Sequence, residues 1–187
     1  MIKLLAKIIL LIGGWRAVGN APDIDKYILI AAPHTSNWDL LLLLCFGALF
    51  NIRVSWMGKH TLFKPPHGWF LKAVGGIPVD RRSKHDVVAQ TVSLIEARDR
   101  VVIAIPPEGT RSRAEYWKSG FYHIAHAAKV PIVITFLDYA SKQGGFGPVI
   151  DSSGSPTEVM DKMREFYKGI SGRFAENFGP VRLREET

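Results

Sequence analysis

The stretch KYILIAAPHTSNWDLLLLLCFGALF, residues 26–50, contains the pattern from which the fold of this chain is predicted. Residues 26–33 form an apolar run of the length and composition expected of a buried strand. The polar segment from His34 to Asp39 follows at once. Residues 40–50 are a second apolar run, which suits a helix but is too short to cross a bilayer. This succession of strand, polar turn and helix is typical of α/β folds.

The rest of the chain continues the alternation. Apolar runs predict strands over residues 52–57, 77–79, 100–105, 131–137 and 146–150. Helical spacing predicts helices over residues 83–98, with Ser83 as N-cap, 119–129 and 156–167, and Pro and Gly interrupt a mixed segment at 58–76. We therefore predict a single-domain α/β fold: a mixed, largely parallel sheet flanked by helices, with its chemistry at the carboxyl ends of strands.

The first residues, MIKLLAKIILLIGGW, predict an amphipathic helix. On such a helix four apolar side chains share one side: Leu4, Ile8, Leu11 and Ile12. Lys7 leaves too short an apolar stretch to span a bilayer, and no cleavage site of a signal peptide follows. We expect residues 1–17 to form a membrane-contacting helix and residues 18–187 to form the globular domain. In the alternative, the helix packs on the core of the domain itself.

The composition excludes several classes of protein. Apolar residues make up 47% of the chain and charged residues 22%, a balance that excludes disordered, fibrous and disulfide-stabilised proteins. The single cysteine, Cys45, lies in an apolar run without a partner, so we interpret it as a small core residue in a reducing compartment. The net charge of +7 favours an anionic partner, namely nucleic acid, lipid headgroups or a phosphorylated substrate.

A histidine and an aspartate five positions apart, His34 and Asp39, are the first candidates for catalysis. If His34 lies in the turn and Asp39 in the first turn of the helix, the carboxylate can fold back to accept the imidazole N–H. That bond fixes the tautomer and leaves the other ring nitrogen free as a general base for a substrate hydroxyl. Taken alone, the pair fits a capping aspartate beside an incidental histidine better than it fits a catalytic site.

Two further polar segments follow predicted strands and carry cations. In PPEGTRSR, residues 106–113, Arg111 and Arg113 are forked donors suited to holding a phosphate. In GGIPVDRR, residues 75–82, Arg81 is placed to complete the same anion site. Each segment by itself is equally compatible with an ordinary solvated turn.

Together these segments resemble the glycerolipid acyltransferase family, which includes glycerol-3-phosphate and lysophosphatidic acid acyltransferases. The matching blocks are His-x4-Asp at 34–39, the glycine-rich segment ending in arginine at 75–81, Glu-Gly-Thr-Arg at 108–111 and Val-Pro with a hydrophobic strand at 130–133. The resemblance implies a sheet with a hydrophobic tunnel for an acyl chain, and His34 and Asp39 as the catalytic pair. It further implies that the acceptor's phosphate is bound by Arg81, Glu108, Gly109, Thr110 and Arg111.

The reaction implied by the resemblance moves a fatty acyl group from acyl-coenzyme A or acyl-carrier protein, as co-substrate, to the hydroxyl of a lysophospholipid. The chain would work as a peripheral or monotopic protein at the cytoplasmic face of a membrane, and no cofactor or metal ion is expected. Departures from the family pattern at Pro33, Pro106 and Ile134 leave the acceptor open. Another lyso-lipid, an amine-containing acceptor and glycerol 3-phosphate are the alternatives.

Other classes of function are less well supported. A nucleic-acid- or membrane-binding module without catalysis would explain the charge. Its cations, however, lie beside glycines at strand ends rather than along one helix, so no nucleic acid is expected as a partner. A serine hydrolase would need a Gly-x-Ser-x-Gly elbow, which the sequence lacks. The aromatic residues between Trp56 and Phe70 are interpreted as core or as the wall of an acyl-chain site.

Overall fold

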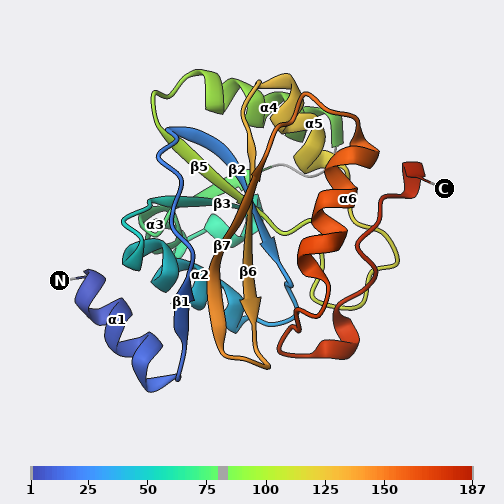
Figure 1. Ribbon diagram of the computed structural model, residues 1–187. Coiled ribbons are helices and arrows are strands. Elements are labelled where there is room, and N and C mark those ends of the chain that lie inside the picture. Colours follow the sequence, from blue (N-terminus) through green and yellow to red (C-terminus); the bar gives the residue numbers. More distant parts are fainter. Residues whose placement is uncertain (1, 80–83, 187) are drawn as a thin grey trace.

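The computed structural model describes residues 2–79 and 84–186, and these residues form an α/β fold around one sheet (Figure 1). Within the described ranges the sheet has seven strands in the order β1-β7-β6-β2-β5-β3-β4. Their bounds are β1 Arg16–Val18, β2 Lys26–Ala32, β3 Val54–Lys59, β4 Gly76–Val79, β5 Val101–Ile105, β6 Ile132–Asp138 and β7 Gln143–Ile150. All neighbouring strands are parallel except β6 and β7, which form an antiparallel pair. The predicted mixed, largely parallel sheet is confirmed.

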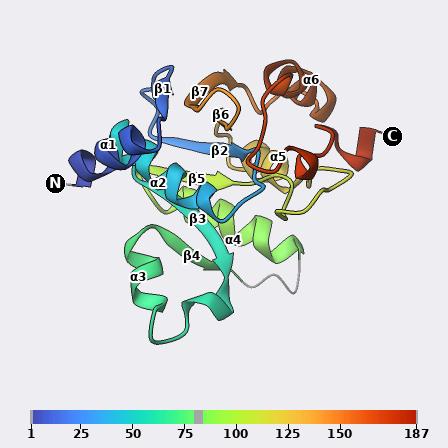
Figure 2. The same ribbon diagram turned by 90° about the horizontal axis from the view of Figure 1, so that it is seen from below.

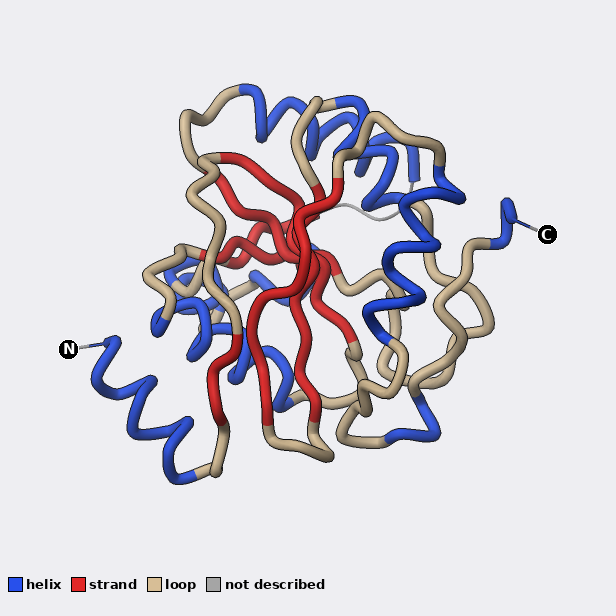
Figure 3. The backbone as a smooth tube through the Cα atoms, viewed as in Figure 1, coloured by secondary structure: helices blue, strands red, loops and turns tan. Residues whose placement is uncertain are grey.

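Helices flank this sheet on both faces (Figure 3). Their bounds are α1 Ile2–Ile12, α2 Trp38–Leu49, α3 Gly68–Ala73, α4 Lys84–Glu96, α5 Gly120–Ala127 and α6 Pro156–Tyr167, with short 3-10 helices η1 His60–Phe63, η2 Ala175–Asn177 and η3 Arg184–Glu186. Local sequence explains where α6 starts, because Ser155 and Glu158 form a capping box and Pro156 occupies the first turn. The expected N-cap at Ser83 lies outside the described residues.

The central strand β2 is buried on both faces, which explains its unbroken apolar run. Its neighbours β5 and β6 are both parallel to it. Ile28 and Ile30 pack into the main core with α5 and α6, whereas Tyr27 and Leu29 pack into a second cluster on the α2 side. Successive side chains of a strand point to opposite faces of the sheet, so each face of β2 must be packed against a separate layer of side chains. Full burial of each such isoleucine stabilises the fold by about 1.5–3 kcal/mol.

Helix α1 packs on α2 through one of its faces. The contact is a small separate cluster that contains Ala6, Leu10, Trp15, Leu42, Cys45 and Phe46. Cys45 is therefore a buried core residue, as predicted. The opposite face of α1 exposes Ile2, Leu4, Leu5, Ile8, Leu11 and Ile12. Across residues 2–79 and 84–186, no helix has the length and apolar character needed to span a membrane.

Several elements were not predicted from the sequence. The three-residue strand β1 pairs with β7, but all its side chains are exposed, so it leaves no pattern of burial in the sequence. Helices η1 and α3 lie inside the mixed segment at 58–76. The residues after α6 return to the carboxyl edge of the sheet, where Leu183 bridges to Trp117. This return brings the tail beside the polar loops that follow β2 and β5.

Candidate active site

The pair His34 and Asp39 lies at the carboxyl end of β2, where the chain turns into α2. Nδ1 of His34 is 3.2 Å from Oδ2 of Asp39. The same oxygen accepts the backbone N–H groups of Thr35 and Ser36, each at 2.8 Å. Asp39 is buried in the first turn of α2, where the helix dipole also favours a negative charge. The carboxylate thus folds back on the loop in the geometry predicted from the spacing.

Tyr139 is a further hydrogen-bond donor to the carboxylate of Asp39. Its hydroxyl donates a 2.7 Å hydrogen bond to Oδ1, the carboxylate oxygen that His34 does not face. The Tyr139 backbone N–H bonds to the carbonyl of Ser171, and its ring packs edge-on against Trp15 with centroids 4.9 Å apart. Burial, together with the bond to Asp39, raises the pKa of Tyr139 well above its usual range, so the hydroxyl is a permanent donor. Sequence reasoning missed this residue, because no local motif marks it.

Glu108 lies beneath the loop that carries His34 instead of on the surface of the cavity. Its side chain is 3% exposed, and its Oε1 accepts the backbone N–H of His34 at 2.9 Å. Burial raises the pKa of Glu108 to about 7. This contact links the polar segment after β5 to the one after β2. The family resemblance implied Glu108 as a phosphate ligand, whereas this geometry favours a role in holding His34 in place.

The remaining residues of the Glu-Gly-Thr-Arg block line the cavity. Gly109 has φ +65°, a conformation that glycine adopts without strain, and a Cβ there would lie 2.6 Å from Nζ of Lys118. Thr110 accepts the backbone N–H of Ser112. Arg111 is exposed and makes no ion pair or hydrogen bond with the described residues. Arg111 and Lys118 are therefore cations available to an anionic ligand, and Lys118 is the one that the sequence analysis missed.

Of the other predicted cations, Arg113 does not join this group in the structure. Arg113 turns away and donates to the backbone carbonyls of Glu176 and Phe178 in the tail. Arg81 falls outside the described residues, so its predicted place beside Arg111 stays a prediction.

The tail packs directly on the loop between His34 and Asp39. The backbone N–H of Phe174 donates to Oγ1 of Thr35 at 3.3 Å. A Cβ at Gly172 would lie 2.7 Å from the same Thr35 oxygen, which shows how closely the two segments approach. The guanidinium of Arg173 lies 5.7 Å from the centre of the Trp38 ring. The tail thus fixes the loop from outside while Glu108 fixes it from beneath.

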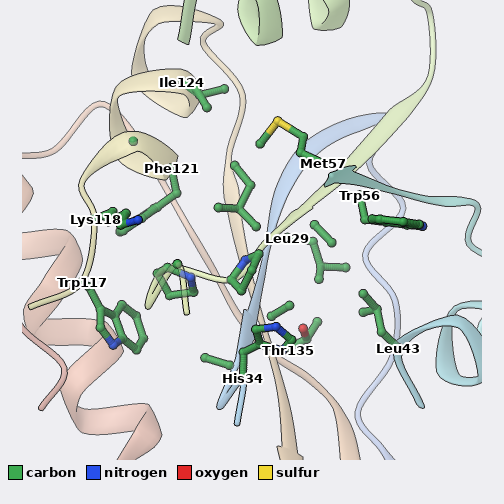
Figure 4. Close-up of a pocket in the computed structure, with 18 of the residues that line it drawn as sticks. Leu29, His34, Leu43, Trp56, Met57, Trp117, Lys118, Phe121, Ile124 and Thr135 are labelled. Atoms are coloured by element: carbon green, nitrogen blue, oxygen red, sulfur yellow. The ribbon is translucent and has the colours of Figure 1, made fainter. Parts of the chain in front are cut away.

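His34 lines a cavity of about 1920 Å³ whose walls are largely apolar side chains. Figure 4 shows Leu43 and Trp56 on one side of Leu29, and Phe121 and Ile124 on the other. Pockets for small ligands are typically about 300–1,000 Å³, so this cavity has room for a long apolar chain. A largely apolar cavity thus lies beside the candidate catalytic pair, where the resemblance implied a hydrophobic tunnel for an acyl chain. Among the residues described, no group of three or more His, Cys, Asp or Glu side chains is placed to hold a metal ion.

The fold and the site define an α/β protein with a histidine–carboxylate pair beside an apolar cavity. The chain belongs to the acyltransferase family, whose model, described as "Acyltransferase", matches residues 17–135. This match includes both members of the pair and the Glu-Gly-Thr-Arg block. The resemblance found in the sequence is confirmed at the level of the family.

Among curated proteins, the chain is 27% identical over 185 residues to a 1-acyl-sn-glycerol-3-phosphate acyltransferase of Saccharomyces cerevisiae, covering 89% of this chain and 60% of that protein. It is 30% identical over 119 residues to the enzyme of the same description from Escherichia coli, covering 59% of this chain and 47% of that protein. The chain therefore spans between about half and three fifths of the length of these relatives.

Among solved structures, the chain is similar to the 1-acyl-sn-glycerophosphate (LPA) acyltransferase PlsC from Thermotoga maritima. The TM-score is 0.62 at 18% sequence identity, and the match covers 90% of this chain and 77% of that chain. At this identity the likeness concerns the fold, and it confirms the predicted architecture.

Proposed function

We propose that this protein transfers a fatty acyl group from acyl-coenzyme A or acyl-carrier protein to the hydroxyl of a lysophospholipid of the 1-acylglycerol 3-phosphate class. The observation that carries the proposal is the 3.2 Å contact of His34 with buried Asp39 at the wall of the large apolar cavity. The family match and the names of the relatives support the same reaction. Another lyso-lipid or an amine-containing acceptor is the alternative within this class.

In the proposed mechanism His34 is a general base. With Nδ1–H directed at Asp39, Nε2 takes the proton of the acceptor hydroxyl as its oxygen attacks the thioester carbonyl. Asp39 stabilises the imidazolium that forms. The tetrahedral intermediate then collapses, the C–S bond breaks, and the thiolate leaves with the proton from His34. General acid–base catalysis of this kind contributes about 10²–10⁴-fold to the rate.

In the proposal, the cations that line the same cavity as His34 supply the recognition of the acceptor. In the proposal, Arg111 forms paired hydrogen bonds with the acceptor's phosphate, Lys118 adds a point charge, and the open backbone at Gly109 permits close approach. Arg81 is retained as a predicted contributor. Glu108 acts on the acceptor only indirectly, through the position of His34.

The exposed face of α1 supports a place at the membrane surface. Its uncovered side chains are apolar, and Lys3 and Lys7 are its only charged residues. Such a helix lies in the interface plane of a bilayer, with its cations near anionic headgroups. We therefore propose peripheral or monotopic binding at the cytoplasmic face, which places the lipid acceptor within reach.

The test is release of free thiol from a long-chain acyl-coenzyme A, with and without a panel of lyso-lipid acceptors. We expect acceptor-dependent release in the wild type, and a loss of at least about 100-fold in kcat in His34→Ala with unchanged thermal unfolding. Release that neither the acceptor nor the substitution affects would point to hydrolysis by another site and would overturn the proposal. If coenzyme A thioesters give no release, the same comparison is made with acyl-carrier protein as the donor.

A further inference from the structure

The aromatic residues between Trp56 and Phe70 divide into two groups in the structure. Trp56 lines the cavity, and Phe63 packs on it with ring centroids 5.9 Å apart, as the sequence analysis expected. Trp69 and Phe70 of α3, in contrast, are 73% and 53% exposed. The expectation that these two rings belong to a core or an acyl-chain wall was wrong. Adjacent large aromatic side chains in water are costly, and such patches mark interaction surfaces.

A third apolar side chain joins them on the same segment. Leu62 of η1 is 48% exposed, and it also lines the cavity. Residues 59–73, which we call the η1–α3 segment, thus expose three large apolar side chains on their outer side, and their inner side forms part of the cavity wall. Leu71 of the same segment also lines the cavity.

The charged side chains in and beside this segment of the sequence are all positive. Between Asp39 and Asp80 the sequence contains no Asp or Glu. The same stretch carries Arg53, Lys59, Lys64 and Lys72. Tryptophan and phenylalanine flanked by lysines form the combination found where a protein meets the headgroup region of a membrane. Long lysine side chains can reach phosphates there while the rings lie deeper.

The η1–α3 segment lies on the same side of the molecule as α1. Figures 1 and 2 both place α3 and α1 on the same side of the molecule, and α6 lies on the other side. Both exposed apolar surfaces also lack carboxylates in their own sequence. One anionic surface can therefore contact both.

We propose that the η1–α3 segment is a second membrane contact, in which Trp69 and Phe70 insert into the headgroup region of an anionic lipid bilayer and Lys64 and Lys72 lie at the lipid phosphates. The occupant is a bilayer rather than a protein because the charged residues near the rings in the sequence are all cations and the segment also borders an apolar cavity. This contact goes beyond the proposed α1 contact and does not depend on the reaction.

The experiment measures binding of the full chain to sucrose-loaded vesicles by sedimentation, without any substrate. One set of vesicles contains phosphatidylglycerol and phosphatidylcholine, and the other contains phosphatidylcholine alone. We expect the double variant Trp69→Ser/Phe70→Ser to lower the partition coefficient on anionic vesicles roughly tenfold or more. Val149→Ser, which removes an exposed apolar side chain of β7, is the matched control and should bind like the wild type. Unchanged binding of the double variant would overturn the proposal.

A second measurement detects insertion directly and keeps an aromatic ring at position 69. In vesicles with brominated acyl chains, Trp69→Phe should lose a large part of the tryptophan quenching seen in the wild type. Quenching equal to that of the wild type would mean that Trp69 does not insert, and the proposal would fall. Lys64→Glu/Lys72→Glu should weaken binding to anionic vesicles and leave the weak binding to neutral vesicles unchanged. The binding experiments measure no acyl transfer. A protein that binds vesicles through this segment but has no acyltransferase activity would therefore refute the proposed function and leave the proposed membrane contact standing.

Discussion

The hydroxyl of Tyr139 donates a 2.7 Å hydrogen bond to Oδ1 of Asp39 from a position 100 residues further along the chain. His34 and two backbone amides contact the other carboxylate oxygen. Tyr139 therefore limits the rotation of the Asp39 side chain and leaves Oδ2 directed at His34. It does not contact the reacting atoms, so we describe it as a positioning residue.

Replacing Tyr139 with phenylalanine tests this role. The ring and its contact with Trp15 stay, while a hydrogen bond to a charged group, worth about 1.5–3 kcal/mol, is lost. We expect kcat to fall about tenfold and the KM for the acceptor to stay within about twofold, because the phosphate site is untouched. A kcat equal to that of the wild type would show that Asp39 needs no support from Tyr139.

Replacing Asp39 with asparagine tests the orientation of His34. The amide cannot stabilise the imidazolium and favours the wrong tautomer when its N–H₂ group faces Nδ1. We expect a loss of about 10²–10⁴-fold in kcat, measured by thiol release at saturating acceptor. Asp99→Asn, an exposed residue in the loop before β5, is the control and should keep full activity. Comparable losses in both variants would mean that the effect is not specific to the site.

Two neighbouring arginines, Arg111 and Arg113, provide a test variant and a control for the proposed phosphate site. Arg111 lines the cavity, whereas Arg113 donates to carbonyls of the tail. Arg111→Ala should raise the acceptor KM about 10- to 100-fold with a much smaller change in kcat. Arg113→Ala should lower the free energy of unfolding by about 1 kcal/mol and leave the acceptor KM unchanged. If the two variants had the same acceptor KM, the assignment of Arg111 would be wrong.

The buried carboxyl of Glu108 predicts a particular dependence of stability on pH. Its pKa is raised to about 7, so between about pH 4.5 and 7 the unfolded chain is ionised there while the folded chain keeps the proton. The folded state then binds more protons, and its stability falls as the pH rises through this window. Glu108→Gln removes this penalty, which is about 3 kcal/mol in full. Urea unfolding should therefore show the variant gaining stability relative to the wild type between pH 4 and pH 8. A constant difference between the two proteins across this range would contradict the assigned pKa.

The parts of the fold that could be predicted from the sequence are those that short stretches of chain determine. The run from Lys26 to Ala32 is apolar because both faces of β2 are covered, and this condition is visible in the residues themselves. The pairing of His34 with Asp39 was equally predictable, since both lie within one turn between a strand and a helix. Glu108 was indicated by its motif, although its buried position under His34 was not.

Tertiary structure decided everything that depends on chain segments far apart in sequence. Tyr139 and Arg173 carry no local signal, because their partners Asp39 and Trp38 are reached only when the segment after β6 and the tail come back beside the loop after β2. The same holds for the aromatic residues after β3. The same residue types occur in a core and at a membrane surface, and only the packing distinguishes the partly buried Phe63 from the exposed Trp69. The sequence by itself therefore determined the strands with buried side chains and the pairing of His34 with Asp39, because hydrophobic periodicity and hydrogen bonds across one turn are short-range. The supports of that pair and the exposed surfaces were decided by long-range packing.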